Sequence, residues 1–144
     1  LADIIAKLTK AGIPVCAHLG LMPQSVNQLG GYYVQGKNKE QAQKILDDAK
    51  SVTKAGAKLV VLECIPESLA TTITTTIKAA TIGIGSGKGT DGQILVTHDM
   101  LGLSSNTYKF CKSYASLEPL NAITNYIHDV KEGVFPEKEY VLAL

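Results

Sequence analysis

Apolar residues recur along this chain in two spacings that alternate with each other. Three stretches repeat apolar residues every three or four positions, as on a helix face. They are residues 2–9, the segment that Asn38 can cap and that Gly56 ends, and residues 66–77. Between these stretches lie short apolar runs, which are typical of parallel strands: 13–19, 58–62 and 81–84. Strands that alternate with helices predict an α/β fold with a parallel sheet.

The remaining elements are less regular. Residues 20–37 form a long loop with a possible helical turn after Pro23, and loops of this length are often functional. Residues 94–96 are interpreted as a fourth strand, although the connection before them is short for a parallel crossover. Pro119 opens a last helix that ends at Gly133, with four aliphatic side chains expected to point inward: Leu120, Ile123, Ile127 and Val130. The tail after Pro136 is expected to be loose.

Glu63 is the polar residue that this pattern sets apart. It follows the apolar run 58–62, which is expected to be a central strand buried on both faces. A carboxylate buried there is costly unless it has a partner, and the carboxyl end of a barrel strand faces the active-site mouth. Position alone leaves two interpretations open: a functional carboxylate, or a strand-end glutamate in a surface ion pair.

Composition limits the classes of protein that fit this pattern. The chain has 144 residues, of which 45% are hydrophobic and 19% are charged, as in an ordinary globular domain. Its net charge of +1 gives no electrostatic reason to bind nucleic acid, and no apolar run approaches the length of a membrane span. Three cysteines without metal-type spacing favour a reduced, cytoplasmic setting.

Two features indicate a part of a larger unit. Leu1 opens a segment that resembles a helix already under way rather than a signal peptide. An open sheet of four parallel strands would leave unpaired edges, which natural sheets avoid, and a closed barrel of eight strands typically needs about 250 residues. The sequence therefore predicts either a small doubly wound domain or half of a barrel.

The glycine-rich segment 83–92 is a candidate binding motif. It fails the phosphate-loop pattern because Lys88 is followed by Gly89 rather than by Ser or Thr. A GxGxxG match at Gly87, Gly89 and Gly92 lies late relative to the strand and lacks an acidic residue about 20 positions on. The segment is better interpreted as a flexible loop at the carboxyl end of the sheet, where backbone can approach a ligand.

Histidine and cysteine residues offer few further candidates. His18 ends the first strand, where a hydrogen-bonded core histidine is commoner than one that faces a ligand. His98 and Asp99 are adjacent, so in a strand they would face opposite sides and form no dyad. His128 is expected to be solvated on its helix, and Cys64 is expected to be a small core residue rather than a nucleophile.

Several longer segments together carry a resemblance to a known family. In order along the chain they are GIPVCAHLGLMPQSVN (12–27), GGYYVQG (30–36), LVVLEC (59–64), IGIGSG (82–87), TDGQILVTHD (90–99) and GVFP (133–136). With these segments the sequence resembles the ketopantoate hydroxymethyltransferase family from Leu1 to about Tyr140.

The resemblance implies a fold and a domain organisation. Family members fold as a (β/α)8 barrel, or TIM barrel, of the phosphoenolpyruvate/pyruvate-binding type. Residues 1–144 resemble only its C-terminal half, strands five to eight, so the chain would be half of a single barrel domain whose N-terminal half is absent. The family assembles into homo-oligomers, commonly decamers.

The resemblance also implies a reaction. The family transfers a one-carbon unit from 5,10-methylenetetrahydrofolate to 3-methyl-2-oxobutanoate, which gives 2-dehydropantoate for pantothenate biosynthesis. A Mg²⁺ ion holds the 2-oxo acid, and its ligands belong to the other half of the barrel, so no metal ligand is assigned here. Glu63 matches the family's proton acceptor, and His18 would line the same mouth and contact the substrate.

The sequence departs from the family pattern at three positions near these motifs. Ala17, Met22 and Ser86 replace the usual Gly, Thr and Ala, which leaves the contacts to folate unassigned. Two other hypotheses stay open at this stage. The chain could be a catalytically inert half-barrel that acts only as a structural or interaction module, or a small nucleotide-binding α/β domain that uses residues 83–92.

Overall fold

A four-stranded parallel sheet forms the centre of the computed structural model, which describes residues 1–29, 31–105, 108–115 and 118–142. Its strands follow the order of the chain: β1 (Cys16–Gly20), β2 (Leu59–Glu63), β3 (Ala80–Ile84) and β4 (Gly92–Gln93). The predicted α/β fold with a parallel sheet is confirmed. The strand expected at 94–96 is wrong, because β4 pairs with β3 just before it and the chain then leaves the sheet. Gly30 of the predicted loop lies outside the described residues.

The helices follow the predicted order. Those before the last strand are α1 (Ala2–Lys10), α2 (Val26–Leu29), α3 (Lys39–Lys54) and α4 (Glu67–Thr76). The later ones are α5 (Thr97–Met100) and α6 (Pro119–Lys131), and short 3₁₀ turns occur at Pro23–Ser25 and Lys138–Tyr140. The predicted cap of α3 is confirmed, because the Asn38 side chain accepts a hydrogen bond from the backbone N–H of Gln41 at 2.8 Å.

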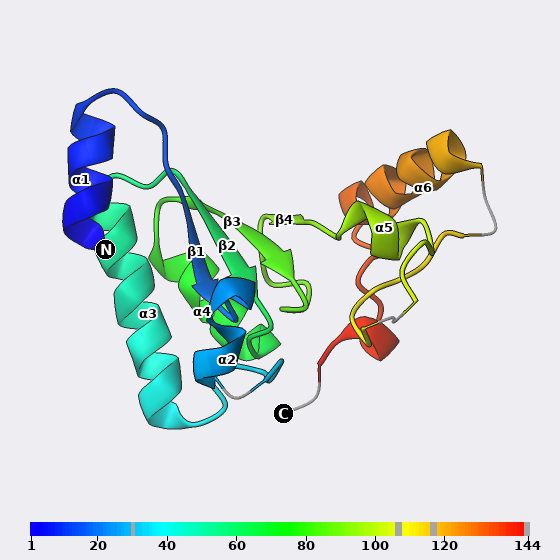
Figure 1. The fold of residues 1–144 in the computed structure, drawn as a ribbon, viewed down its shortest axis with the longest axis horizontal. Helices are drawn as coiled ribbons and strands as arrows, with labels where there is room; N and C mark the ends of the chain where they lie inside the picture. The colour runs from blue at the N-terminus through cyan, green and yellow to red at the C-terminus, as the bar shows by residue number, and fades with distance from the viewer. Residues whose placement is uncertain (30, 106–107, 116–117, 143–144) are drawn as a thin grey trace.

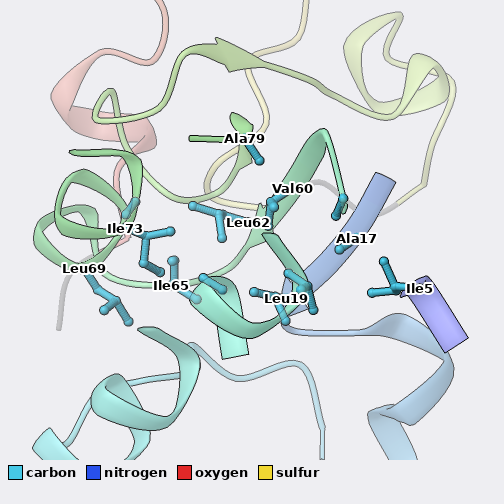
Figure 2. Packing of buried hydrophobic residues seen from close by; sticks show 13 residues of the cluster. Ile5, Ala17, Leu19, Val60, Leu62, Ile65, Leu69, Ile73 and Ala79 are labelled. Atoms are coloured by element: carbon cyan, nitrogen blue, oxygen red, sulfur yellow. The ribbon is translucent and has the colours of Figure 1, made fainter. Parts of the chain in front are cut away.

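Among the described residues, helices cover one face of the sheet. Residues of α1, α3 and α4 pack with alternate strand residues into the main core, where Figure 2 shows Leu19, Val60 and Leu62 gathered with Ile73 of α4. The opposite face carries the other half of each strand, and there Leu59 is 40% exposed. The expectation that β2 is buried on both faces is therefore wrong. β2 is a central strand, but no described helix packs over its second face.

The segment that contains α5 and α6 stands beside the sheet rather than on it (Figure 1). Helix α6 turns Ala122 and Tyr126 toward Met100 and Tyr114, and it exposes Leu120, Ile123 and Ile127. The predicted inward face of this helix is therefore wrong for these three residues. Periodicity identified an apolar stripe, but the contacts available to α6 lie on the neighbouring stripe.

Polar contacts tie the end of the chain to this segment. Lys112 Nζ lies 2.8 Å from Asp129 Oδ2 and 2.7 Å from Glu137 Oε1, and Tyr114 donates its hydroxyl to Asp129 at 2.6 Å. Phe135 is buried as well. The prediction of a loose tail after Pro136 is therefore wrong for the part of the tail that the structure describes, because Glu137 is held by a lysine far away in sequence.

Candidate active site

Glu63 occupies the last position of β2, at the carboxyl end of the sheet. The register places it beside Gly20 of β1 and Ile84 of β3. Its side chain is 13% exposed and lines a cavity of about 320 Å³. In open parallel sheets, ligands bind outside the carboxyl ends of the strands. The structure therefore places Glu63 where the sequence predicted, and it favours a functional carboxylate over a glutamate in an exposed surface pair.

Backbone hydrogen bonds fix the strand end that carries Glu63. The N–H of Leu21 donates to the Glu63 carbonyl, and the N–H of Cys64 donates to the Ile84 carbonyl, both at 2.9 Å. The N–H of Gln35, in the long loop, donates to the Cys64 carbonyl at 2.8 Å. The turn after β2 is thus held from both neighbouring strands and from the loop.

Two residues in left-handed backbone conformations shape this turn. Gly20 has φ +90, and a Cβ there would overlap the Glu63 carbonyl oxygen and lie 2.8 Å from Ile65 Cγ2. Cys64, directly after Glu63, has φ +49, which is unusual for a residue with a side chain. Strained backbone of this kind clusters at functional sites, where surrounding contacts hold it in place. Here those contacts are the hydrogen bonds of the turn.

Ser86 adds a buried side-chain hydroxyl to the same support. It donates to the Leu62 carbonyl at 2.7 Å and accepts from the Ile65 N–H at 3.4 Å. The sequence flagged this serine only as a departure from the alanine usual in the family. Its hydroxyl joins the backbone on both sides of Glu63 to the end of β3.

His18 contacts Glu63 from the neighbouring strand. It lies two residues before Gly20 on the same face of the sheet, and its Nε2 is 3.0 Å from Glu63 Oε2. This atom is buried and makes no hydrogen bond of good geometry, so the contact is close but poorly aligned. His18 is not among the residues that line the cavity. The structure thus brings the two predicted residues together, with Glu63 at the cavity wall and His18 touching its carboxylate.

The cavity wall contains residues that the sequence did not single out as a site. They are the buried carboxylate of Asp99, the exposed Lys109, and aromatic side chains that include Tyr32, Tyr108 and Phe110. Asp99 lies beyond the carboxyl end of β4, and Glu63 lies at the carboxyl end of β2, so the argument applied to Glu63 could have found it. It was missed because the strand was placed at 94–96, and Asp99 was considered only as a possible partner of His98 in a strand. Asp99 lies in α5, buried, while His98 beside it is exposed.

The buried cysteines near the cavity are protonated thiols. Burial is the main cause that raises the pKa of Cys64 to about 12, and the nearby Glu63 raises it further. Burial and the neighbouring Asp99 likewise raise the pKa of Cys111 to about 12. A nucleophilic cysteine needs a lowered pKa instead. The interpretation of Cys64 as a core residue agrees with its burial, and His128 is exposed as predicted.

The glycine-rich loop after β3 is packed against α4. Glu67 Oε1 accepts a hydrogen bond from the N–H of Lys88 at 2.9 Å, and a Cβ on Gly87 would lie 2.5 Å from Glu67 Cγ. A Cβ on Gly89 would overlap Thr71. The glycines therefore let the loop approach the helix, which accounts for their presence without a bound phosphate.

The described residues contain neither a cluster of metal ligands nor a helix that could span a membrane. Within 1–29, 31–105, 108–115 and 118–142, no three His, Cys, Asp or Glu side chains gather closely enough to hold a metal ion. None of the helices in these ranges has both the length and the apolar character that crossing a bilayer requires.

The fold and the cavity define a class of protein: a parallel α/β chain with two carboxylates in a cavity at the carboxyl ends of its strands. The ketopantoate hydroxymethyltransferase family profile matches residues 1–138. The chain belongs to this family.

Curated relatives agree with this assignment. A 3-methyl-2-oxobutanoate hydroxymethyltransferase of Carboxydothermus hydrogenoformans is 54% identical over 147 residues, which cover 100% of this chain and 53% of the relative. Proteins of the same name from Shewanella oneidensis and Campylobacter jejuni are 53% and 51% identical, each over 97% of this chain and over 54% and 52% of the relative. The chain spans about half the length of the curated relatives it matches.

Proposed function

We propose that this chain is the C-terminal half, strands five to eight, of a (β/α)8 barrel that transfers a hydroxymethyl group to 3-methyl-2-oxobutanoate. The donor is 5,10-methylenetetrahydrofolate and Glu63 is the proton acceptor. The observation that carries this proposal is the Glu63 carboxylate, fixed at the end of β2 and lining the cavity. Family membership and the names of the relatives support the choice of the oxo acid and of the transferred group.

The uncovered face of the sheet supports the half-barrel. In a closed barrel, one face of every strand points into a packed interior and the other packs against helices. Here helices cover one face, while Leu59 on the other face is 40% exposed. Beyond β4, Ile94 and Val96 are exposed as well, at 40% and 51%. A second set of strands would bury these residues and pair the open edges of the sheet.

The chemistry assigned to Glu63 is the removal of one proton. The C–H bond at C3 of 3-methyl-2-oxobutanoate, next to the ketone, breaks, and the carboxylate takes the proton. C3 keeps the electron pair and forms the new C–C bond with the methylene carbon of the folate, whose bonds to N5 and N10 both break. Water supplies the oxygen and the hydrogen of the new hydroxyl group. Tetrahydrofolate is the leaving group, and its two nitrogens take the proton held by Glu63 and the second proton of the water. His18, whose Nε2 lies 3.0 Å from the carboxylate, is predicted to face the oxo acid.

The Mg²⁺ ion expected of the family does not fit the residues of this chain that the structure describes. Glu63 and Asp99 line one cavity, but no third ligand joins them. The ligands of the ion remain a prediction for the other half of the barrel. The homo-oligomeric state also remains a prediction.

The test is exchange of the C3 hydrogen of 3-methyl-2-oxobutanoate in D₂O, followed by NMR. This chain is combined with the part of the Carboxydothermus hydrogenoformans relative that it does not match, in the presence of Mg²⁺. We expect exchange that is lost in Glu63→Gln and kept in Glu40→Gln, a control on the exposed start of α3.

Two results would count against the proposal. Exchange that persists in a folded Glu63→Gln protein would remove Glu63 as the base. A folded, associated complex without any exchange would instead support the inert structural module.

A further inference from the structure

A second carboxylate lies in the same cavity as Glu63 and has no strong partner among the residues that the structure describes. Asp99 is 6% exposed and lines the cavity. Among the described residues, the only hydrogen bond to its carboxylate comes from the Cys111 thiol, whose Sγ is 3.8 Å from Oδ2. A thiol is a weak donor. A carboxylate this deeply buried normally has strong hydrogen-bond or ionic partners.

Aromatic side chains form one wall of this cavity. The rings of Tyr108 and Phe110 are nearly parallel, with centroids 5.5 Å apart and an interplanar angle of 9°. The ring centroids of Tyr32 and Tyr108 are 5.9 Å apart. All three residues line the cavity together with Asp99. Such a wall suits a flat ring, because aromatic groups gain energy from stacking beyond the area they bury.

We propose that Asp99 and this aromatic wall bind the pterin ring of the one-carbon donor, with the carboxylate accepting hydrogen bonds from the 2-amino group and from N3–H. This inference rests on the proposed function and names a subsite within it. The chemical feature that is recognised is an edge with two adjacent N–H donors on a flat ring. A carboxylate matches this edge with both of its oxygens, and a charged acceptor gives stronger hydrogen bonds than a neutral one.

The position of Asp99 agrees with separate binding of the two substrates in the cavity. Glu63 ends β2, while Asp99 lies in α5, beyond β4 on the other side of β3. One carboxylate is therefore available for the oxo acid and the other for the carrier of the carbon. The burial and cavity volume of about 320 Å³ are in the range of small-molecule sites.

The direct test is discrimination between ligands by the unaltered protein. Calorimetry of the reconstituted protein compares tetrahydrofolate with the analogue in which hydrogen replaces the 2-amino group. We expect the analogue to bind about tenfold to a hundredfold more weakly, the loss of a hydrogen bond to a charged acceptor. Equal affinities would overturn the proposal. Guanosine carries the same N–H edge, so preferential binding of guanosine would assign the subsite to a nucleobase and also overturn it.

Substitution of Asp99 then tests whether this residue recognises the pterin ring. Asp99→Asn should raise KM for methylenetetrahydrofolate by about tenfold or more, with a smaller change in KM for the oxo acid, and should abolish the discrimination against the analogue. The control Asp47→Asn removes an exposed carboxylate on α3 and should change neither. Full discrimination in a folded Asp99→Asn protein would contradict the proposal.

The two proposals fail in different ways. Absence of C3 exchange in the unaltered protein, with tetrahydrofolate discrimination intact, would overturn the proposed function and leave the pterin subsite standing. C3 exchange without discrimination between tetrahydrofolate and its analogue would leave the proposed function standing and overturn the pterin subsite.

Discussion

Replacement of Gly20 by alanine tests whether the backbone around Glu63 is as tightly constrained as the structure indicates. Gly20 has φ +90, and its new Cβ would overlap the Glu63 carbonyl oxygen. The left-handed conformation alone costs about 1–2 kcal/mol for a residue with a Cβ. The overlap also forces the strand ends apart, at the point where Leu21 donates to Glu63. A buried hydrogen bond lost there adds about 1–3 kcal/mol.

The total expected loss is therefore about 2–5 kcal/mol in the free energy of unfolding, measured by urea denaturation. Gly12→Ala is the matched control, because Gly12 has φ +81 and nothing lies within 4 Å of its Cβ position. It should show the conformational loss of about 1–2 kcal/mol alone.

The same pair of variants separates the effect on stability from the effect on the position of the proposed base, Glu63. A displacement of about 1 Å can lower a rate about a hundredfold, so C3 exchange should fall strongly in Gly20→Ala and stay near its normal rate in Gly12→Ala. The reasoning is refuted if the two variants lose equal stability and exchange at equal rates. That result would mean that the strand ends yield to the new methyl group.

Three further predictions concern residues around the site and in the C-terminal segment. At neutral pH, an alkylating reagent should modify the exposed Cys16 readily. The thiolate fraction of Cys64 and Cys111 should be about a thousandfold below that of a free thiol, because the pKa of each rises from 9.0 to about 12. Rapid labelling of all three cysteines in the native protein would contradict this expectation. Hydrogen bonds from Lys112 and Tyr114 lower the pKa of Asp129. The contribution of this carboxylate to stability is therefore complete above its unfolded pKa of about 3.9 and is lost as the pH falls through the lower folded pKa. The urea midpoints at pH 7 and pH 3 should accordingly differ less in Asp129→Asn than in the unaltered chain. Ser86→Ala should lower the free energy of unfolding by about 1–3 kcal/mol, whereas Ser51→Ala, on the exposed side of α3, should not change it. Equal urea midpoints for the two variants would show that the buried hydroxyl of Ser86 contributes nothing to stability.

Local sequence patterns predicted the order of elements because each pattern reflects a local cause. The cap at Asn38 and the apolar periodicity of α1, α3 and α4 depend on neighbouring residues, and all were found. The position of Glu63 also followed from its place after an apolar run. Exposure was harder to predict, because it depends on what packs against each face. The second face of β2 and the Leu120 side of α6 both carry apolar side chains, and the described residues leave Leu59 and Leu120 exposed there.

The candidate site shows the same division. Glu63 was predicted because a charge beside a strand is visible in one segment of sequence. The cavity wall was not predicted, since it joins residues from the long loop, α5 and the 108–115 segment, which approach one another only through the fold. Asp99 illustrates the difference: its neighbours in sequence favoured a strand, whereas its burial against Cys111 is a contact between distant parts of the chain.

The contacts that fix Glu63 all come from within this chain. Leu21, Gln35 and Ser86 hold the turn that carries it, and His18 touches its carboxylate. In the proposed half-barrel, a partner that closes the open face of the sheet would therefore meet the Glu63 carboxylate already in position. The described residues offer no third ligand for a cation beside Glu63 and Asp99, so under this proposal the metal ligands expected of the family would come from the complementary half. The proton acceptor and the metal centre would then lie on opposite halves of one barrel, and activity would require both halves to be joined.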